Sequence, residues 1–227
     1  MIEIPVEQGS GDWVMARLGI PTAGNAHKIL TPATRKYSKQ ARGYAFRLVA
    51  EKLLNESLGT IDHLEWVARG KEMEPYAVRM FEATEGYETA PVGFLLTDDR
   101  RVGGTPDRRI KGEAAFLEVK CPAPWVQLEY LIDGFGADYM AQVQCQIHVG
   151  EAEWVGRYAF HPKMPPTLQK TYRDELYIHE LKNALDQFCT ELAEIEEKAR
   201  STGFFEERIV AGQLGIDELL SGVDDAL

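Results

Sequence analysis

Two acidic residues and one lysine stand at a spacing that could bind a divalent cation and cleave a phosphodiester bond. Thr105-Pro106-Asp107 is followed, after ten intervening residues, by Glu118-Val119-Lys120. Residues i and i+2 of a β-strand point to the same face, so Glu118 and Lys120 would project together. An aspartate at the end of the preceding strand can meet them across a hairpin. Two carboxylates and a backbone carbonyl make an oxygen cage that suits Mg²⁺ or Mn²⁺.

The chemistry expected of this set is phosphodiester hydrolysis. The metal would polarise the phosphate and generate the nucleophile, and the ammonium group of Lys120 would position that nucleophile. The alternative is a surface hairpin in which Glu118 and Lys120 form a weak ion pair, worth under about 1 kcal/mol. The apolar neighbours Phe116, Leu117 and Val119 favour a buried strand, where unpaired charges would be costly without a metal.

Helices are expected on both sides of this region. Ser38 is a suitable N-cap for a helix whose apolar residues follow at helical spacing. Glu74 would lie on another helix, which precedes the sheet. Apolar spacing predicts helices over residues 12–30 (interrupted by Pro21), 38–57, 62–84, 124–132, 138–149 and 178–201.

Short strands are expected in the middle of the chain. Apolar and alternating runs bounded by turn residues predict strands over 92–96, 101–107, 114–120 and 153–160, with an edge strand over 171–177. This order predicts a single α/β domain over residues 1–227, with a mixed central β-sheet flanked by helices. A helical part (about 10–86) would precede the sheet core (about 90–177) and a C-terminal helix and tail (about 178–227).

Charge is distributed unevenly along the chain. The net charge of −11 over 227 residues argues by itself against nucleic-acid binding, because phosphate contacts rely on Lys and Arg. After Arg173 acidic residues predominate, so the chain could hold a polyanion on one side only, although solvated helix faces would give the same pattern. Residues 27–52, in contrast, contain the acid Glu51 and seven basic residues: Lys28, Arg35, Lys36, Lys39, Arg42, Arg47 and Lys52.

Other features limit the class of protein. No apolar run approaches the roughly 18 residues that cross a bilayer, and no secretory signal is visible. The three cysteines are too few and too scattered for a disulfide framework. We therefore expect a cytoplasmic protein with no membrane contact. The sequence contains no G-x-x-x-x-G-K-[ST] loop, so ATP-driven motion is not expected.

Several blocks together resemble a known nuclease family. Pro106-Asp107 with Glu118-Val119-Lys120 resembles the PD-(D/E)xK nuclease signature. The order and separation of further blocks resemble the lambda-exonuclease branch, which includes phage-type alkaline exonucleases and YqaJ-like viral recombinases. The resemblance runs from about Val6 to Phe160, and its blocks are Val6-Glu7-Gln8-Gly9, Trp13 with Arg17-Leu18-Gly19, Gly70-Lys71-Glu72-Met73-Glu74, Leu117 to Pro122 and Tyr139 to Gln144.

This resemblance implies a restriction-endonuclease-like core and a defined activity. Family members digest one strand of linear double-stranded DNA from the 5′ end with Mg²⁺, for which Mn²⁺ can substitute. They leave a 3′ single-stranded overhang for a single-strand annealing protein. They are often rings of three subunits around the DNA. A bacterial or phage-infected host cell would be the setting.

The resemblance also assigns roles to the residues of the cleavage site. Asp107 would bridge metal ions, and Glu118 with the Val119 carbonyl would complete the metal site. Lys120 would orient the attacking water. The two remaining positions, carried over from the matching blocks, are Glu74, which would reach the metal region, and Gln142, which would support Lys120 or the scissile phosphate.

A second group of residues is expected to contact DNA. Arg17 would bind the terminal phosphate, and Thr105 would donate its hydroxyl nearby. Trp13 would lie near the DNA end or fill the core, and Lys39 and Arg42 would contact phosphates or be exposed helix charges. The sequence departs from the family at two positions of the 5′-phosphate pocket, because Gly24 replaces a small hydroxyl residue and Val126 an arginine.

Three alternatives remain open at this point. The same fold could carry a catalytically idle DNA-end-binding or assembly protein. Another PD-(D/E)xK nuclease could act with different polarity. A nuclease with an iron–sulfur cluster would need four cysteine ligands, and the chain has only Cys121, Cys145 and Cys189.

Overall fold

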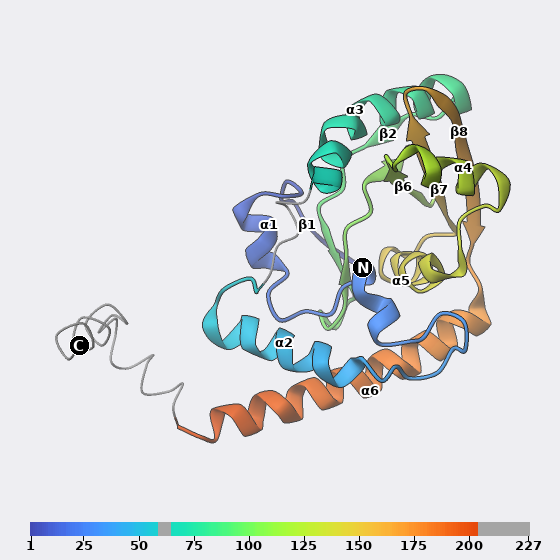
Figure 1. Ribbon diagram of the computed structural model, residues 1–227. Coiled ribbons are helices and arrows are strands. Elements are labelled where there is room, and N and C mark those ends of the chain that lie inside the picture. Colours follow the sequence, from blue (N-terminus) through green and yellow to red (C-terminus); the bar gives the residue numbers. More distant parts are fainter. Residues whose placement is uncertain (59–64, 204–227) are drawn as a thin grey trace, which may run out of the picture.

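The computed structural model is shown in Figure 1, and it describes residues 1–58 and 65–203. Its helices are α1 (Gly11–Ala16), the 3₁₀ helix η1 (Ala23–Lys28), α2 (Ala41–Leu54), α3 (Glu65–Glu85), α4 (Pro124–Ile132), the 3₁₀ helix η2 (Ala137–Tyr139), α5 (Met140–Gly150) and α6 (Glu175–Arg200). The strands are β1 (Ile2–Ile4), β2 (Thr89–Ala90), β3 (Phe94–Leu96), β4 (Gly103–Gly104), β5 (Arg108–Ile110), β6 (Ala115–Lys120), β7 (Trp154–His161) and β8 (Met164–Tyr172). Among the described helices, none is both long and apolar enough to cross a membrane.

The strands form two sheets. The larger has the order β2-β5-β6-β7-β8, and the smaller is the antiparallel set β1-β3-β4. In the larger sheet β6 and β7 run parallel, whereas the other neighbours are antiparallel. A mixed sheet with helices packed on it confirms the predicted fold class.

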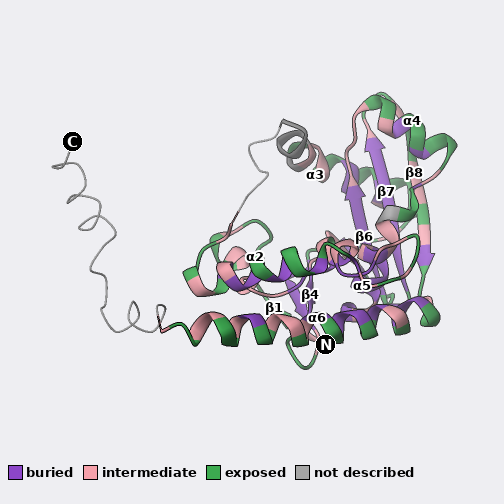
Figure 2. Ribbon diagram, turned by 60° about the horizontal axis from the view of Figure 1, so that its bottom comes forward, coloured by how far each residue is buried: buried purple, intermediate pink, exposed green. Residues whose placement is uncertain are grey.

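Strand β6 is the centre of the larger sheet, and it is buried from Ala115 to Val119 (Figure 2). Its side chains alternate between two apolar clusters. Phe116 packs in the cluster that includes α5, α2 and α6, while Leu117 and Val119 pack in the cluster that includes α3. The face that carries Phe116 therefore also carries Glu118 and Lys120, next to α5.

Helices α2 and α6 lie side by side along one side of the molecule (Figures 1 and 2). The rings of Tyr44 and Phe188 stack with centroids 5.4 Å apart. At the far end of α2, Lys52 Nζ lies 2.6 Å from Glu196 Oε2. These contacts join the basic N-terminal block to the acidic C-terminal third.

The observed elements differ from the predicted ones in several places. The helix predicted over 12–30 is wrong, because α1 ends at Ala16 and only a 3₁₀ turn follows Pro21. The edge strand predicted over 171–177 is also wrong. Its region is the end of β8 and the start of α6, where the side chain of Asp174 accepts a hydrogen bond from the Tyr177 N–H and caps the helix.

Smaller differences concern element ends. The helix predicted from Ser38 begins at Ala41, and the Ser38 hydroxyl instead accepts from the Gln40 N–H at 3.2 Å. The strand predicted over 101–107 is reduced to β4. Strands β1, β2 and β5 were not predicted, because two or three residues are too few to show alternation. The start of the third predicted helix, residues 62–64, lies outside the described residues.

Candidate active site

The predicted acidic pair and the lysine come together on the β5–β6 hairpin. Asp107 directly precedes β5, which pairs with β6 so that Arg108 lies opposite Leu117. The Val119 N–H donates to Asp107 Oδ2 at 2.6 Å. Lys120 Nζ donates to Glu118 Oε1 at 2.5 Å. The hairpin thus fixes the Asp107 carboxylate on the backbone of the strand that carries Glu118 and Lys120.

Helix α5 completes the surroundings of Glu118. Gln142 Nε2 donates to Glu118 Oε1 at 2.7 Å, and Gln146 Nε2 donates to Oε2 at the same distance. The residue is only 5% exposed, so these amides and Lys120 replace the water that an ionised carboxylate would otherwise bind. Gln142 therefore contacts Glu118. The resemblance had implied that it would support Lys120 or the scissile phosphate instead.

Gln146 is the functional candidate that sequence reasoning missed. It follows Gln142 by four residues, so the two amides lie on one face of the helix. Its position is 2% exposed, which is unusual for a glutamine. The available sequence signal was the pair of glutamines four residues apart, on a helix that follows the strand carrying Glu118.

Electrostatics in the site reflect three carboxylates around one lysine. Desolvation, reinforced by the Glu118 and Glu74 carboxylates, raises the pKa of Asp107 well above the usual value. Desolvation and then Glu118 likewise raise the pKa of Glu74. Desolvation acts to lower the pKa of Lys120, but Glu118 and Asp107 outweigh it and raise that pKa. The cluster therefore has an excess of negative charge that a cation would offset.

Glu74 reaches the site from α3, immediately before Pro75. It is half-buried, and its carboxyl interacts electrostatically with Glu118, Lys120 and Arg108. Within the described residues its carboxyl group makes no hydrogen bond. Glu74 is thus an acidic neighbour of the Asp107–Glu118 pair and is not part of its hydrogen-bonded network.

The donor set fits a hard divalent cation. Asp107, Glu118 and the Val119 carbonyl offer only oxygen atoms, which Mg²⁺ and Mn²⁺ prefer. Across residues 1–58 and 65–203, no group of three or more His, Cys, Asp or Glu side chains has the geometry of a metal site. Two carboxylates still suffice for Mg²⁺, because this ion keeps several waters and takes substrate phosphate oxygens as ligands.

Three predicted DNA-contacting residues meet beside this site. The Trp13 Nε1–H donates to Thr105 Oγ1 at 3.0 Å, which ties α1 to the residue two positions before Asp107. The Arg17 guanidinium lies 3.8 Å from the centroid of the Trp13 ring. Arg17 Nε is buried without a hydrogen-bond partner. Trp13 is half-buried and contacts these two residues, outside the apolar clusters.

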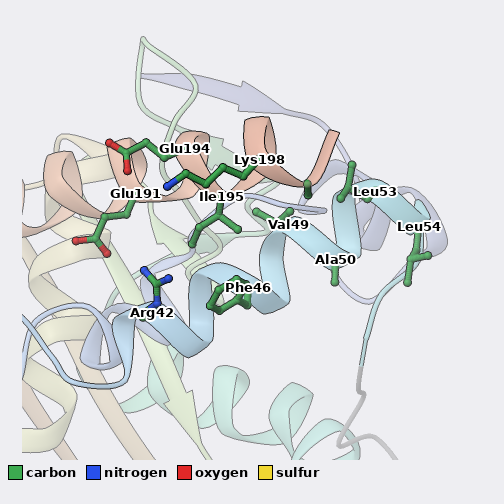
Figure 3. Close-up of a pocket in the computed structure, with 11 residues that line it drawn as sticks. Arg42, Phe46, Val49, Ala50, Leu53, Leu54, Glu191, Glu194, Ile195 and Lys198 are labelled. Carbon is green, nitrogen blue, oxygen red and sulfur yellow. The ribbon is translucent and has the colours of Figure 1, made fainter. Parts of the chain in front are cut away.

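Two other residues predicted to contact DNA lie apart from the Asp107–Glu118 pair. Arg42 of α2 lies 5.1 Å from the centroid of the Phe46 ring, at the rim of an apolar groove of about 460 Å³ between α2 and α6. Figure 3 shows its guanidinium beside Glu191 of α6. Lys39 is exposed and has no ion-pair partner in the described part of the chain. The structure therefore does not join either residue to Asp107 and Glu118.

A cavity of about 510 Å³ opens beside α5. Gln142 and Tyr139 line one part of it, and Gly24, Thr31 and Ser38 line another. A Cβ at position 24 would meet no atom within 4 Å, so this wall is open at the position where the resemblance implied a hydroxyl residue. Val126 is not among the residues that line this cavity; like Tyr139, it packs on the cluster of Tyr130, Phe135 and Ala159.

Known structures share this fold. The crystal structure of an alkaline exonuclease, LHK-Exo, from Laribacter hongkongensis matches with a TM-score of 0.76 and 23% identity, covering 86% of this chain and 98% of that one. The structure of LHK-Exo in complex with dAMP matches with a TM-score of 0.74 and 25% identity over the same shares. A phage-related exonuclease from Haemophilus somnus 129PT matches with a TM-score of 0.65 and 13% identity, covering 79% of this chain and 96% of that one.

Sequence comparison adds the family. No curated protein sequence matches the chain. The family model described as "YqaJ-like viral recombinase domain" matches residues 12–153, more than half of the chain. This match and the exonuclease fold confirm the family resemblance and support a nuclease. The chain belongs to the YqaJ-like viral recombinase domain family.

Proposed function

We propose that this protein is a Mg²⁺-dependent exonuclease that digests one strand of linear double-stranded DNA in the 5′-to-3′ direction and leaves 3′ single-stranded overhangs. The observation that carries the proposal is the Glu118 carboxylate, which three N–H donors hold beside Asp107 on a buried hairpin. The cluster is the PD-(D/E)xK set in this chain: Asp107, Glu118 and Lys120. An acidic pair with a lysine in this arrangement suits phosphodiester hydrolysis.

Asp107, Glu118 and the Val119 carbonyl would hold the metal ion. When bound, Mg²⁺ supplies Lewis-acid polarisation of the phosphate and favours ionisation of the attacking water. The chain contributes geometry, because Val119 fixes Asp107 and α5 fixes Glu118. Both carboxylates are therefore oriented before the substrate arrives, which reduces the reorganisation needed during the reaction.

Lys120 would act on the substrate side of the same cluster. Its ammonium group has three N–H donors, and Glu118 accepts one of them. The others can hold the attacking water and a phosphate oxygen in line. Glu74, from α3, would add negative charge next to the metal region.

Arg17 and Thr105 would hold the DNA end. The Trp13 ring packs against the Arg17 guanidinium and leaves its Nε without a protein acceptor. A phosphate oxygen is the natural acceptor for an arginine N–H in such a place. Because Thr105 is two residues from Asp107, a phosphate bound here would be close to the bond that is cleaved.

Family membership supports the wider setting of the reaction. The proposal includes a homotrimeric ring around DNA, single-strand annealing recombination as the process, and an annealing protein as the partner that receives the overhang. Light scattering coupled to gel filtration tests the ring, with three times the 25.5 kDa chain mass expected. A monomer at all working concentrations would contradict that part.

The test of activity uses linear duplex DNA with different labels at its 5′ and 3′ ends. Wild-type protein is incubated with Mg²⁺ or with EDTA and compared with Asp107→Ala. Early release of the 5′ label that needs both Mg²⁺ and Asp107 is expected. Asp98→Ala is the matched control, because this aspartate is 81% exposed and pairs with the N-terminal amine.

Each other outcome has a defined meaning. Internal cuts or early release of the 3′ label would show a nuclease of another polarity. Tight binding of DNA ends without cleavage would show a catalytically idle end-binding protein. Cleavage by Asp107→Ala at the wild-type rate would refute the assignment of the site.

A further inference from the structure

A buried arginine that forms no ion pair with any described residue lies one strand away from the candidate catalytic residues. Arg157 on β7 is only 3% exposed. Its Nε and Nη1 atoms are buried without a hydrogen-bond acceptor. It also forms no ion pair with any residue of the described segments. Because burying an unpaired ion costs several kcal/mol, a native protein retains such a group only where something compensates for it.

Aromatic side chains surround the Arg157 guanidinium. The guanidinium carbon lies 5.0 Å from the centroid of the Phe135 ring. Phe135 stacks on Tyr130 with centroids 4.4 Å apart, and the hydroxyls of Tyr130 and Tyr139 lie 3.1 Å apart. Burial lowers the pKa of Arg157, and the two phenols act in the opposite direction. No carboxylate is among the groups that act on it.

These groups can bind an anion with several oxygen atoms. A guanidinium presents five N–H donors in a planar fork that matches phosphate. In the Tyr130–Tyr139 pair one hydroxyl donates to the other, so one O–H remains to donate elsewhere. The cluster thus combines a full positive charge with a free hydroxyl donor, in surroundings with little water.

The cluster adjoins the candidate active site. Arg157 lies directly opposite Glu118 in the parallel register of β6 and β7. Both phenols interact electrostatically with Lys120 as well as with Arg157. Tyr139 is half-buried and lines the 510 Å³ cavity together with Gln142. A ligand could therefore approach Arg157 from the side of the phenols.

We propose that Arg157, together with the Tyr130–Tyr139 hydroxyl pair, binds one phosphate group of the DNA next to the cleavage site. This inference rests on the proposed nuclease function, because DNA is the polyanion that this function brings to the cavity. The phosphate supplies the counter-charge that no described residue provides to Arg157. It is either the 5′-terminal phosphate or an internucleotide phosphate, and both offer the same oxygen acceptors.

The test compares Arg157→Met with wild type in two measurements. Methionine fills similar space and removes the buried charge. Thermal unfolding reports stability, and fluorescence anisotropy with duplex DNA in EDTA reports affinity without cleavage. Arg101→Met is the matched control, because it removes the same charge from an exposed arginine that pairs with Asp99 and Asp186.

Opposite changes in stability and affinity are expected. Loss of the unpaired charge should raise the Tm of Arg157→Met by at least about 2 °C. Its affinity for DNA should fall about tenfold or more, as for a lost charged hydrogen bond. A structural arginine would give the reverse: a lower Tm with unchanged affinity, which would overturn the proposal.

The identity of the phosphate follows from modified duplexes. One set has a 5′-hydroxyl in place of the 5′-phosphate, and another has a single neutral methylphosphonate linkage at successive positions from the end. One of these modifications should weaken DNA binding by the wild-type protein and leave DNA binding by Arg157→Met unchanged. If every modification weakens both proteins equally, Arg157 contacts no particular phosphate and the proposal is wrong.

A second variant keeps the test decisive if Arg157→Met does not fold. Tyr139→Phe retains the ring and removes only the hydroxyl, and it should lower affinity at the same phosphate position. If this variant bound DNA with the same affinity as wild type, the role of the phenol pair would be contradicted. Because binding is measured in EDTA, absence of wild-type cleavage would refute the proposed function without deciding this inference.

Discussion

At the scale of single residues, the site depends on how one buried carboxylate is satisfied. Glu118 accepts hydrogen bonds from Lys120, Gln142 and Gln146, while Asp107 accepts from the Val119 N–H. A buried carboxylate with this number of donors keeps a fixed orientation. Each donor can therefore be tested by its own substitution.

Lys120→Ala should reduce DNA cleavage by at least about a hundredfold and leave DNA affinity in EDTA within about twofold of wild type. The reason is that its ammonium group acts on the reacting groups. Removing one such hydrogen-bond donor lowers the rate of an enzyme by about 10²–10³. Single-turnover cleavage and anisotropy measure the two quantities. Near-normal cleavage would show that the active site lies elsewhere.

Gln146→Leu should raise the Mg²⁺ concentration needed for half-maximal cleavage by about tenfold, because one Glu118 oxygen loses its donor. Titration of Mn²⁺ by calorimetry should show the same loss of affinity. Gln144→Leu is the control on the same helix. That glutamine is also buried, but it contacts the Tyr172 carbonyl and the Asp174 N–H, so only stability should fall.

At the scale of elements, the distance between α5 and β6 sets the geometry of the site. Helix α5 carries both glutamines that hold Glu118, and its last residue, Gly150, lies against the ring of Phe116. A Cβ at position 150 would come within 2.2 Å of that ring. The absence of a side chain there lets the helix lie close enough for its amides to reach the strand.

Gly150→Ala should lower the free energy of unfolding by about 1–3 kcal/mol, because the added methyl group overpacks the contact with Phe116. Urea unfolding measures the change, and cleavage should fall as α5 shifts. Gly43→Ala in α2 is the control. A Cβ there meets nothing within 4 Å, so this substitution should raise stability by about 0.5–1 kcal/mol. Equal effects of the two substitutions would refute the close approach of α5.

At the scale of the whole molecule, two cations of the basic N-terminal block, Arg35 and Lys52, pair with acids of the C-terminal third. Arg35 lies within 3.6 Å of both Asp174 and Glu180, and its guanidinium carbon is 4.9 Å from the centroid of the Tyr177 ring. Lys52 pairs with Glu196. The uneven charge pattern of the sequence is therefore partly a pattern of internal ion pairs, and fewer cations face DNA than the count suggests.

Lys39→Ala should reduce the slope of log affinity against log salt by about one, because each phosphate contact releases about one counterion. Anisotropy at several salt concentrations measures the slope. Arg35→Met should lower the Tm slightly and leave the slope unchanged, since its charge is already paired within the fold. A larger change in slope for Arg35 than for Lys39 would reverse this assignment.

The sequence was enough to predict the fold class and the family, and it pointed to Asp107, Glu118 and Lys120 as the candidate cleavage site. Helices with long apolar periodicity and the buried strand β6 could be recognised because their patterns are local. The positions of Asp107, Glu118 and Lys120 on one hairpin follow from strand alternation, and the hairpin needs only a short connection. Strands of two or three residues, such as β2 and β5, could not be recognised because their pairing partners decide their existence.

Tertiary structure alone decided the contacts between distant parts of the chain. Gln146 meets Glu118 across 28 positions, and Trp13 meets Thr105 across 92. Helix packing decides which face of α5 lies on the sheet and which cations pair with acids. No local sequence pattern decides either. Arg157 gave no signal in the sequence. It became conspicuous only when the fold buried it without a partner, because the energetic cost of a buried charge depends on its surroundings.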